Sequence, residues 1–144
     1  MLSKTKIVIA SGYFDPIHVG HVEYLEKASA LGDLLYVIVN NDAQAELKKG
    51  KPFMNQEDRK TIVRALGCVD SAFISVDTDA SVCNSIEKIV NMFTDAEFIF
   101  AKGGDRHKGE IPESAICEKL NVKIVDGLGE KIRSSSEYIN SAKE

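Results

Sequence analysis

The sequence predicts an α/β fold in which a doubly wound, mainly parallel sheet of five strands has helices on both faces. Two observations carry this prediction. Short apolar runs of strand length alternate along the chain with longer segments in which apolar residues recur at helical spacing. The chain also has 144 residues, 44% of them hydrophobic and 28% charged, which suits one globular domain over residues 1–144 with a core of its own.

The expected strands are short and rich in aliphatic and aromatic residues. The first, residues 7–9, is an unbroken apolar run of the kind that is buried on both faces of a parallel sheet. The remaining strands are expected at residues 34–39, 72–76, 97–101 and 122–125. Helical periodicity predicts helices from residue 20 to residue 31 and over residues 57–66, 81–93, 112–120 and 134–142.

Charge and cysteine content exclude several kinds of partner and site. A net charge of −4 argues against broad electrostatic binding to DNA or RNA, although clustered lysines can still bind a small polyanion. The three cysteines are odd in number and far apart, so neither a disulfide framework nor a zinc site is indicated. The N-terminal apolar run is too short for a signal-peptide core, and no segment approaches a membrane span. We therefore expect a cytoplasmic protein that binds small molecules, with neither nucleic acid nor a membrane as partner.

Residues 7–30 read as a strand, a glycine-containing turn and the start of a helix. A helix that opens after such a turn presents free N–H groups and the positive end of its dipole, which favour a phosphate. His18 and His21 flank that position, and Gly20 between them leaves room for a phosphate to approach the backbone. A purely structural interpretation is also open, in which Asp15 caps the helix and both histidines are ordinary turn residues.

Two other polar turns are expected beside this one. Ligands of such sheets bind at the carboxyl ends of the strands, near the switch in strand order. Asn41 and Asp42 follow the second expected strand, and Asp42 can orient an acceptor or simply cap a helix over residues 43–47. The stretch from Lys102 to Asp105 follows the fourth strand, where its two glycines let backbone amides approach a base or ribose. As a bare turn the same stretch is uninformative.

Three lysines gather in the segment after the second expected strand. Lys48, Lys49 and Lys51 surround a glycine, and clustered lysines of this kind can bind a small polyanion. A lysine run is usually a solvated face, and that interpretation stays open for Lys48 and Lys49.

Three serines stand where the last expected helix begins. Their N–H groups can bind a β- or γ-phosphate, with Arg133 or Lys131 supplying positive charge, and a plain serine N-cap is the alternative. The serines are Ser134, Ser135 and Ser136.

These motifs together resemble a known family. GYFDPIHVGH, residues 12–21, is similar to the first signature of the cytidylyltransferase-like nucleotidyltransferases, the HxGH superfamily. The segments VNNDA, KKGK, QEDR, CVD and KGGD follow in the family's order, so the resemblance covers nearly the whole chain. The second signature, usually RTxGIST(S/T), is matched by residues 129–136, where the leading arginine is absent. The resemblance implies a Rossmann-like version of the predicted fold and an enzyme that transfers a nucleotide to a phosphorylated acceptor.

The resemblance also implies a role for each motif. An acceptor phosphate would attack the α-phosphorus of ATP or CTP in line, with Mg²⁺ bound through the nucleotide phosphates and no protein metal site. The catalytic residues would be His18, His21 and Lys51, and the acceptor would be bound by Asp42, Lys48 and Lys49. The nucleotide would be bound by Gly12, Tyr13, Phe14, Asp15, Gly20, Lys102, Gly103, Asp105, Arg133, Ser134, Ser135 and Ser136.

Within the family, the middle of the chain is most similar to the adenylyltransferase domain of the heptose pathway of lipopolysaccharide core biosynthesis. That similarity implies ATP and a sugar 1-phosphate as substrates. Glycerol-3-phosphate cytidylyltransferases usually have an arginine before the segment that reads Cys68-Val69-Asp70 here, and its absence favours ATP over CTP. FMN adenylyltransferases, the archaeal-type FAD synthetases, remain an alternative. A nucleotide-binding module without turnover is a second alternative, which the two histidines, Asp15 and the lysines disfavour.

The family resemblance further implies a homodimer. Arg59 resembles the arginine of an EHRK-type segment that supports the site or the subunit interface. Arg59 and Arg64 also border apolar residues, an arrangement that suits an interface. The alternative is that the apolar residues between and after them face the core.

Overall fold

The structure is a computed structural model that describes residues 4–103 and 112–128. Its five strands form one sheet in the order β3-β2-β1-β4-β5, and every pairing between them is parallel. The strands are β1 (Thr5–Gly12), β2 (Leu34–Val39), β3 (Ser71–Ile74), β4 (Ala96–Gly103) and β5 (Lys123–Leu128). The helices are α1 (Val19–Ser29), α2 (Asp42–Lys49), α3 (Gln56–Arg64), α4 (Cys83–Val90) and α5 (Ser114–Lys119). The predicted fold class is therefore confirmed.

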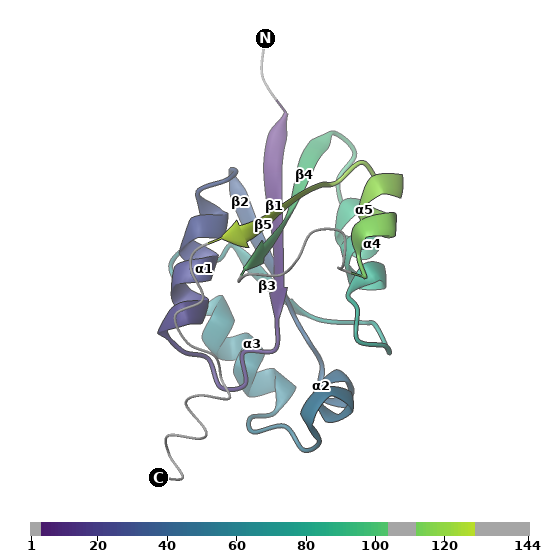
Figure 1. Ribbon diagram of the computed structural model, residues 1–144. Coiled ribbons are helices and arrows are strands. Elements are labelled where there is room, and N and C mark those ends of the chain that lie inside the picture. Colours follow the sequence, from purple (N-terminus) through teal and green to yellow (C-terminus); the bar gives the residue numbers. More distant parts are fainter. Residues whose placement is uncertain (1–3, 104–111, 129–144) are drawn as a thin grey trace.

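The helices cover both faces of the sheet. Figure 1 shows α1 on one side and α4 with α5 on the other. Side chains of β1 alternate between the two resulting cores, because successive residues of a strand point to opposite faces. Ile7 and Ile9 pack with residues of α4 and α5, whereas Val8 and Ala10 pack with residues of α1 and α3. Both sets are fully buried, which explains why this strand reads as an unbroken apolar run.

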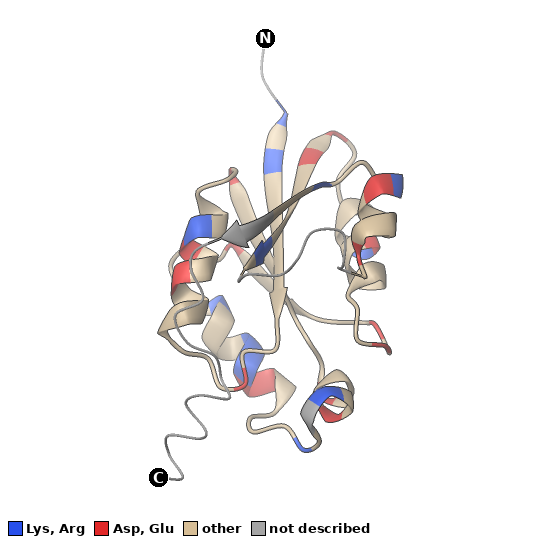
Figure 2. Ribbon diagram, viewed as in Figure 1, with Lys and Arg blue, Asp and Glu red and all other residues tan. Residues whose placement is uncertain are grey.

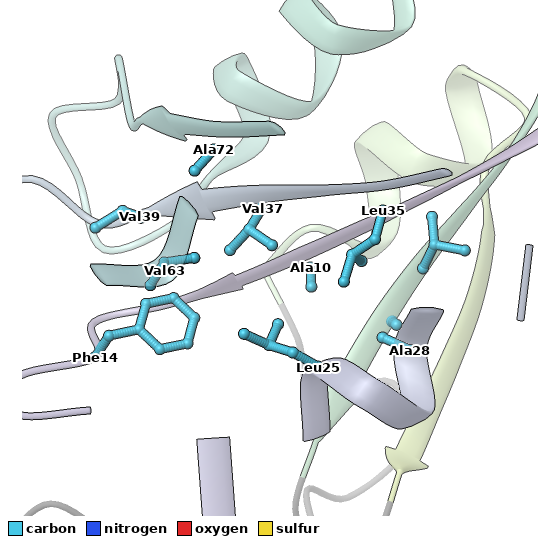
Figure 3. Close-up of a cluster of buried hydrophobic side chains, with 11 residues drawn as sticks. Ala10, Phe14, Leu25, Ala28, Leu35, Val37, Val39, Val63 and Ala72 are labelled. Atoms are coloured by element: carbon cyan, nitrogen blue, oxygen red, sulfur yellow. The ribbon is translucent and has the colours of Figure 1, made fainter. Parts of the chain in front are cut away.

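The second core lies beneath the glycine-containing turn. Figure 3 shows Phe14 from the turn, Leu25 and Ala28 from α1, and Val63 from α3 gathered against the sheet. These side chains are fully or almost fully buried. The first turn of the chain is thus fixed by the same apolar cluster that holds α1 and α3.

Most charged residues lie outside the two apolar cores, although Asp15, Arg59 and Asp77 are buried. Figure 2 shows charged residues on the helices, on the connecting segments and near the ends of strands. Figure 2 shows basic residues, in blue, on α2 and on the segment after it. Both lie at the end of the molecule towards which β1 points. Within residues 4–103 and 112–128, no helix is both long and apolar enough to cross a bilayer.

Element boundaries differ from the expected ones where polar side chains end an element. The helix expected over residues 81–93 begins only at Cys83, since the Asp77 carboxylate accepts hydrogen bonds from the amides of Asn84 and Ser85 at 2.7 and 2.9 Å. The third strand ends at Ile74, before the buried Ser75, which hydrogen-bonds with Asp77. The helix expected over residues 134–142 lies outside the described residues.

Candidate active site

The two histidines of the first turn cap α1 together. His18 is the N-cap residue, and its Nδ1 atom accepts a hydrogen bond of 3.1 Å from the amide of Gly20. The Nδ1 atom of His21 in turn accepts from the amide of His18 at 3.2 Å. The rings stack, with centroids 3.9 Å apart and planes 26° from parallel. Reciprocal capping of this kind is usually made by Ser or Thr with Glu or Gln, so it was not predicted from the sequence.

This capping fixes what the imidazoles can do chemically. A neutral imidazole whose Nδ1 atom accepts a hydrogen bond carries its proton on Nε2. Both histidines are therefore set up to donate from Nε2, although that atom of His18 is shielded from solvent. The start of α1 adds the positive end of a helix dipole. The arrangement is suited to an anion such as a phosphate.

The alternative interpretation, in which Asp15 caps the helix, is wrong, because the cap residue is His18. The two carboxylate oxygens of Asp15 accept hydrogen bonds from the amides of Phe53 and Met54, at 2.8 and 2.6 Å, and its side chain is fully buried. Asp15 thus ties the histidine turn to the segment after α2, which carries Lys51. The buried carboxylate has a supporting position rather than an open face for a nucleotide.

Phe14 and Gly12 also support the turn from below. Phe14 is 1% exposed, has a positive φ of 52°, and its ring meets the edge of His21 with centroids 5.0 Å apart. A Cβ atom on Gly12 would lie 2.9 Å from the tip of the Phe14 ring. The absence of a side chain at Gly12 therefore makes room for the Phe14 ring. The expected role of Gly12 in nucleotide binding is compatible with this contact.

Asp42 lies in the first turn of α2, one residue after its cap. The cap is Asn41, whose side-chain oxygen accepts from the amide of Gln44 at 2.8 Å. The expectation that Asp42 caps residues 43–47 is therefore wrong by one residue. The Asp42 carboxylate instead pairs with Arg59, Oδ1 to Nη2, at 2.7 Å, and keeps a third of its side-chain surface exposed.

Arg59 is buried, with 1% of its surface exposed. Besides Asp42 it donates to the backbone oxygens of Tyr13, Asn40 and Met54, at 2.8, 2.6 and 2.9 Å. It therefore joins the histidine turn, the end of β2 and the segment after α2. Its expected role in supporting the site agrees with these contacts, whereas a place at the margin of a subunit interface is ruled out by its burial.

The lysines of α2 and the following segment are exposed where they are described. The Lys48 amine lies 4.4 Å from the ring centroid of Tyr13, the half-buried residue at the start of the histidine turn. Lys51 is exposed on the segment that Asp15 holds, and the Lys49 side chain lies outside the described part of the structure. Lys48 is thus brought to the histidine turn from 35 residues along the chain, and Lys51 lies two residues before Phe53, which Asp15 holds.

Burial raises the pKa of the Tyr13 phenol, the nearby Arg59 lowers it, and the negative charge of Glu113 raises it further. Glu113 stands directly before α5 and is buried. The sequence analysis did not single out this carboxylate, because a lone glutamate after a proline carries no motif. Glu113, on the face of the sheet that carries α4 and α5, is thus near enough to Tyr13 for its charge to affect the Tyr13 pKa.

Lys102 and Gly103 end β4, and Lys102 lies 5.5 Å from the ring centroid of Phe100. A Cβ atom on Gly103 would lie 2.9 Å from the ring of Tyr24 on α1. The Tyr24 hydroxyl donates to the carbonyl of Ala101 at 2.6 Å and accepts from the amide of Ser11 at 3.3 Å. The sequence analysis did not single out Tyr24.

The expected site residues Asp105, Arg133, Ser134, Ser135 and Ser136 lie outside the described residues.

Tyr24 marks the switch in strand order. The pairing of β1 with β4 ends at Ala10 and Ala101, and the hydroxyl stands between the next amide of β1 and the last paired carbonyl of β4. The two strands part at this point, as sheets of this type do where they bind ligands. The histidine turn and the lysines after β2 follow strands at this edge, and Lys102 lies in the last residues of β4.

Comparisons with known proteins agree with this geometry. The Bifunctional protein HldE of Helicobacter pylori is 44% identical over 133 residues, 83% of this chain and 28% of that protein. The FAD synthase of Ferroglobus placidus is 36% identical over 140 residues, 96% of this chain and 84% of that protein. The crystal structure of a lipopolysaccharide core biosynthesis protein from Thermoplasma volcanium has a TM-score of 0.67 and 26% identity, covering 85% of this chain and 95% of that one.

The chain spans only 19–28% of the length of the HldE proteins that it matches. The family model described as cytidylyltransferase-like, by contrast, matches residues 9–139 and so includes every strand and helix of the structure apart from the first residues of β1. A match of this extent, on a sheet whose carboxyl edge carries the HxGH turn, shows that the chain belongs to the cytidylyltransferase-like family.

Proposed function

We propose that the protein transfers AMP from ATP to the phosphate of a sugar 1-phosphate of the heptose type and releases pyrophosphate. Membership of the cytidylyltransferase-like family makes it a nucleotidyltransferase. The observation that carries the proposal is the pair of stacked, mutually capped histidines at the start of α1, with Lys48 beside the same turn. A module that only binds a nucleotide has no need of two imidazoles held together at the start of a helix.

In the proposed reaction an oxygen of the acceptor phosphate forms a bond to the α-phosphorus of ATP. The bond from the α-phosphorus to the bridging oxygen breaks, and pyrophosphate leaves with the electron pair. His18 and His21 stabilise the charge that develops on the phosphate oxygens, and the amides of α1 add to that field. Lys48 and Lys51 neutralise the leaving group or the acceptor, with Asp42 held by Arg59 to orient the acceptor.

Mg²⁺ is proposed to enter with the nucleotide, bound through phosphate oxygens and water. When bound, it would neutralise the β- and γ-phosphates. Residues 4–103 and 112–128 hold no group of three His, Cys, Asp or Glu side chains that could form a cage around a metal ion. The chain's own task is then to position the phosphates, through α1 and the lysines.

The acceptor and the nucleotide are argued from similarity. The similarity to HldE proteins supports a heptose 1-phosphate, and the similarity to an FAD synthase that is matched over 84% of its length supports FMN as a second candidate. Both alternatives are adenylyl transfers, which favours ATP over CTP. The residues before Asp70 support the same preference, because the arginine expected of a glycerol-phosphate cytidylyltransferase is missing there.

The test is release of pyrophosphate with either nucleotide and each of three acceptors: heptose 1-phosphate, FMN and glycerol 3-phosphate. We expect turnover with ATP and heptose 1-phosphate, and calorimetry should show that ATP binds more tightly than CTP. Turnover with FMN alone would replace the sugar acceptor, and productive turnover with CTP would overturn the adenylyl assignment. ATP binding without turnover of any acceptor would indicate a binding module.

We also propose a homodimer, although Arg59 does not contribute to its interface. Arg59 is buried and unavailable, but Ile62 and Arg64 are exposed on α3, and Leu47 and Phe53 are each 66% exposed near α2. Apolar side chains of this size are commonly covered in an assembly. Light scattering should give twice the 15.8 kDa of one chain, and a monomer mass at all micromolar concentrations would refute the dimer.

A further inference from the structure

Glu113 is a buried carboxylate, and one of its two oxygens accepts a hydrogen bond. Only 4% of its surface is exposed, and its Oε2 atom accepts a hydrogen bond of 2.9 Å from the amide of Val82, the residue before α4. Its Oε1 atom is buried and meets no hydrogen-bond donor among the described residues. A buried carboxylate oxygen without a donor is unfavourable, so its retention calls for an explanation beyond folding.

Capping of α4 does not explain this glutamate. The start of α4 is already capped by Asp77, whose carboxylate accepts from the amides of Asn84 and Ser85 and from the Ser85 hydroxyl. Glu113 adds one hydrogen bond to the amide of Val82, a task that a single oxygen of an amide side chain performs equally well. Among the residues that the structure describes, nothing occupies the second oxygen, and it can serve a ligand.

The fold places Glu113 at the edge of the sheet that carries the histidine turn. Both α4 and α5 follow parallel strands, so both helices begin at the carboxyl edge, on the face opposite α1. The charge of Glu113 also reaches Tyr13, whose pKa it raises. Tyr13 has the Lys48 amine 4.4 Å from its ring centroid. Tyr13, the residue after β1, thus lies within electrostatic reach of the cations Arg59 and Lys48 and of the anion Glu113.

We propose that the Oε1 atom of Glu113 accepts a hydrogen bond from a hydroxyl group of the acceptor and selects for polyhydroxylated acceptors. This inference rests on the proposed function and deepens it. A carboxylate repels phosphate, so it orients the acceptor with its phosphate towards Lys48 and the histidines and its hydroxyl end towards α5. A site built to bind a hydroxyl strongly rejects an analogue that lacks it, because the buried acceptor is then left unpaired.

The test is Glu113→Gln. Glutamine keeps an oxygen for the Val82 amide and replaces the second oxygen with an NH₂ group, so α4 stays capped while the ligand loses a charged acceptor. We expect KM for the sugar 1-phosphate to rise by roughly ten- to a hundredfold, the range for a hydrogen bond to a charged group. The affinity for ATP and the melting temperature should stay close to those of the unaltered protein.

Two comparisons make the result decisive. Asp77→Asn weakens the capping of α4 without touching Glu113, so it should lower the melting temperature and leave KM unchanged. A series of monodeoxy sugar 1-phosphates should contain one analogue that binds the unaltered protein at least about tenfold more weakly, while Glu113→Gln binds that analogue and the parent alike. This analogue series also tests the unaltered protein by itself, should the variant fold poorly.

The inference is overturned if the unaltered protein and Glu113→Gln have the same KM for the acceptor. It is also overturned if removal of each hydroxyl weakens binding equally in the two proteins. Failure of the proposed function looks different, since the unaltered protein would then release no pyrophosphate with any acceptor. In that case the inference falls with the function on which it rests.

Discussion

The Arg59 guanidinium donates a 2.7 Å hydrogen bond to the Asp42 carboxylate, and through this pair the start of α3 holds the start of α2. The Arg59 side chain is fully buried while that of Asp42 is one-third exposed, so the pair joins the interior to the candidate acceptor site. The same guanidinium carries the hydrogen bonds to Tyr13, Asn40 and Met54 described above. One side chain thus sets the relative positions of three segments that meet at the site.

Replacing Arg59 should therefore destabilise the whole edge of the sheet. We expect Arg59→Ala to cost about 3–5 kcal/mol of unfolding free energy, since it leaves a carboxylate and three carbonyl oxygens without their donor. Urea denaturation measures the effect. Arg64→Ala is the matched control, because Arg64 is exposed on the same helix and should cost less than about 0.5 kcal/mol. Equal effects of the two variants would refute this account of Arg59.

His18 should show separate effects on stability and on activity. His18→Ala removes the cap of α1 and should cost about 1 kcal/mol of stability, besides lowering kcat by about a hundredfold or more. His18→Asn keeps a side-chain acceptor for the Gly20 amide but lacks the Nε2 donor. It should therefore recover the stability and not the activity. Calorimetric melting and pyrophosphate release measure the two quantities, and an active asparagine variant would contradict the role of the imidazole.

His21 allows the same separation. Glutamine at this position can still accept from the His18 amide, as in an ordinary capping box. We expect His21→Gln to melt near the unaltered protein and to lose about a hundredfold or more in kcat. Loss of stability together with normal kcat would show that His21 serves the fold alone.

Gly103→Ala should be destabilising because of Tyr24. The added Cβ atom would lie 2.9 Å from the Tyr24 ring, which is anchored through its hydroxyl and has little freedom to move. We expect a cost of about 1–3 kcal/mol in urea denaturation. Gly67→Ala is the control, since a Cβ atom there meets nothing within 4 Å. In a Tyr24→Ala background the cost of Gly103→Ala should nearly vanish, and additive costs would contradict the contact.

Cys117 should make the protein less stable in alkali. Burial, with contributions from the charges of Glu113 and Cys83, raises the pKa of its thiol from 9.0 to about 12. Between these values the unfolded chain releases the proton and the folded chain keeps it, so the unfolding free energy falls as pH rises. Below pH 9 both states are protonated and the effect is absent. Cys117→Ala removes this term, so from pH 8 to pH 11 the unfolding free energy of the unaltered protein should fall relative to that of the variant. Parallel pH profiles would refute the prediction.

The sequence predicted the strands and the histidine turn well because both are local signals. An apolar run such as residues 7–9 is buried on both faces wherever a parallel sheet forms, and its neighbours need not be known. The contacts that support the turn are not local. Asp15 is held by amides 38 and 39 residues further on, and Arg59 binds carbonyls from three segments. Such pairings depend on the packed structure, so the sequence pattern carries no signal for them.

Two residues show the same limit at the site itself. Tyr24 lies in a helix whose apolar periodicity identifies only the buried face, and nothing in that periodicity indicates that its hydroxyl reaches two strands. Asp42 was placed correctly beside the second strand, yet the cap fell to Asn41, since both residue types favour that position. Sequence patterns located the carboxyl edge of the sheet, where the polar residues gather. Which of these residues form hydrogen bonds within the protein depends on the packing.

The Tyr24 hydroxyl bridges β1 and β4 at the level of Ser11 and Ala101, where the pairing of the two strands ends. Gly103 lets the ring that carries this hydroxyl pack closely. The Ser11 amide and the Ala101 carbonyl are therefore both bonded within the protein at the point where the strands part. A molecule that covers this edge of the sheet leaves neither backbone group without a partner, so its binding carries no such desolvation cost.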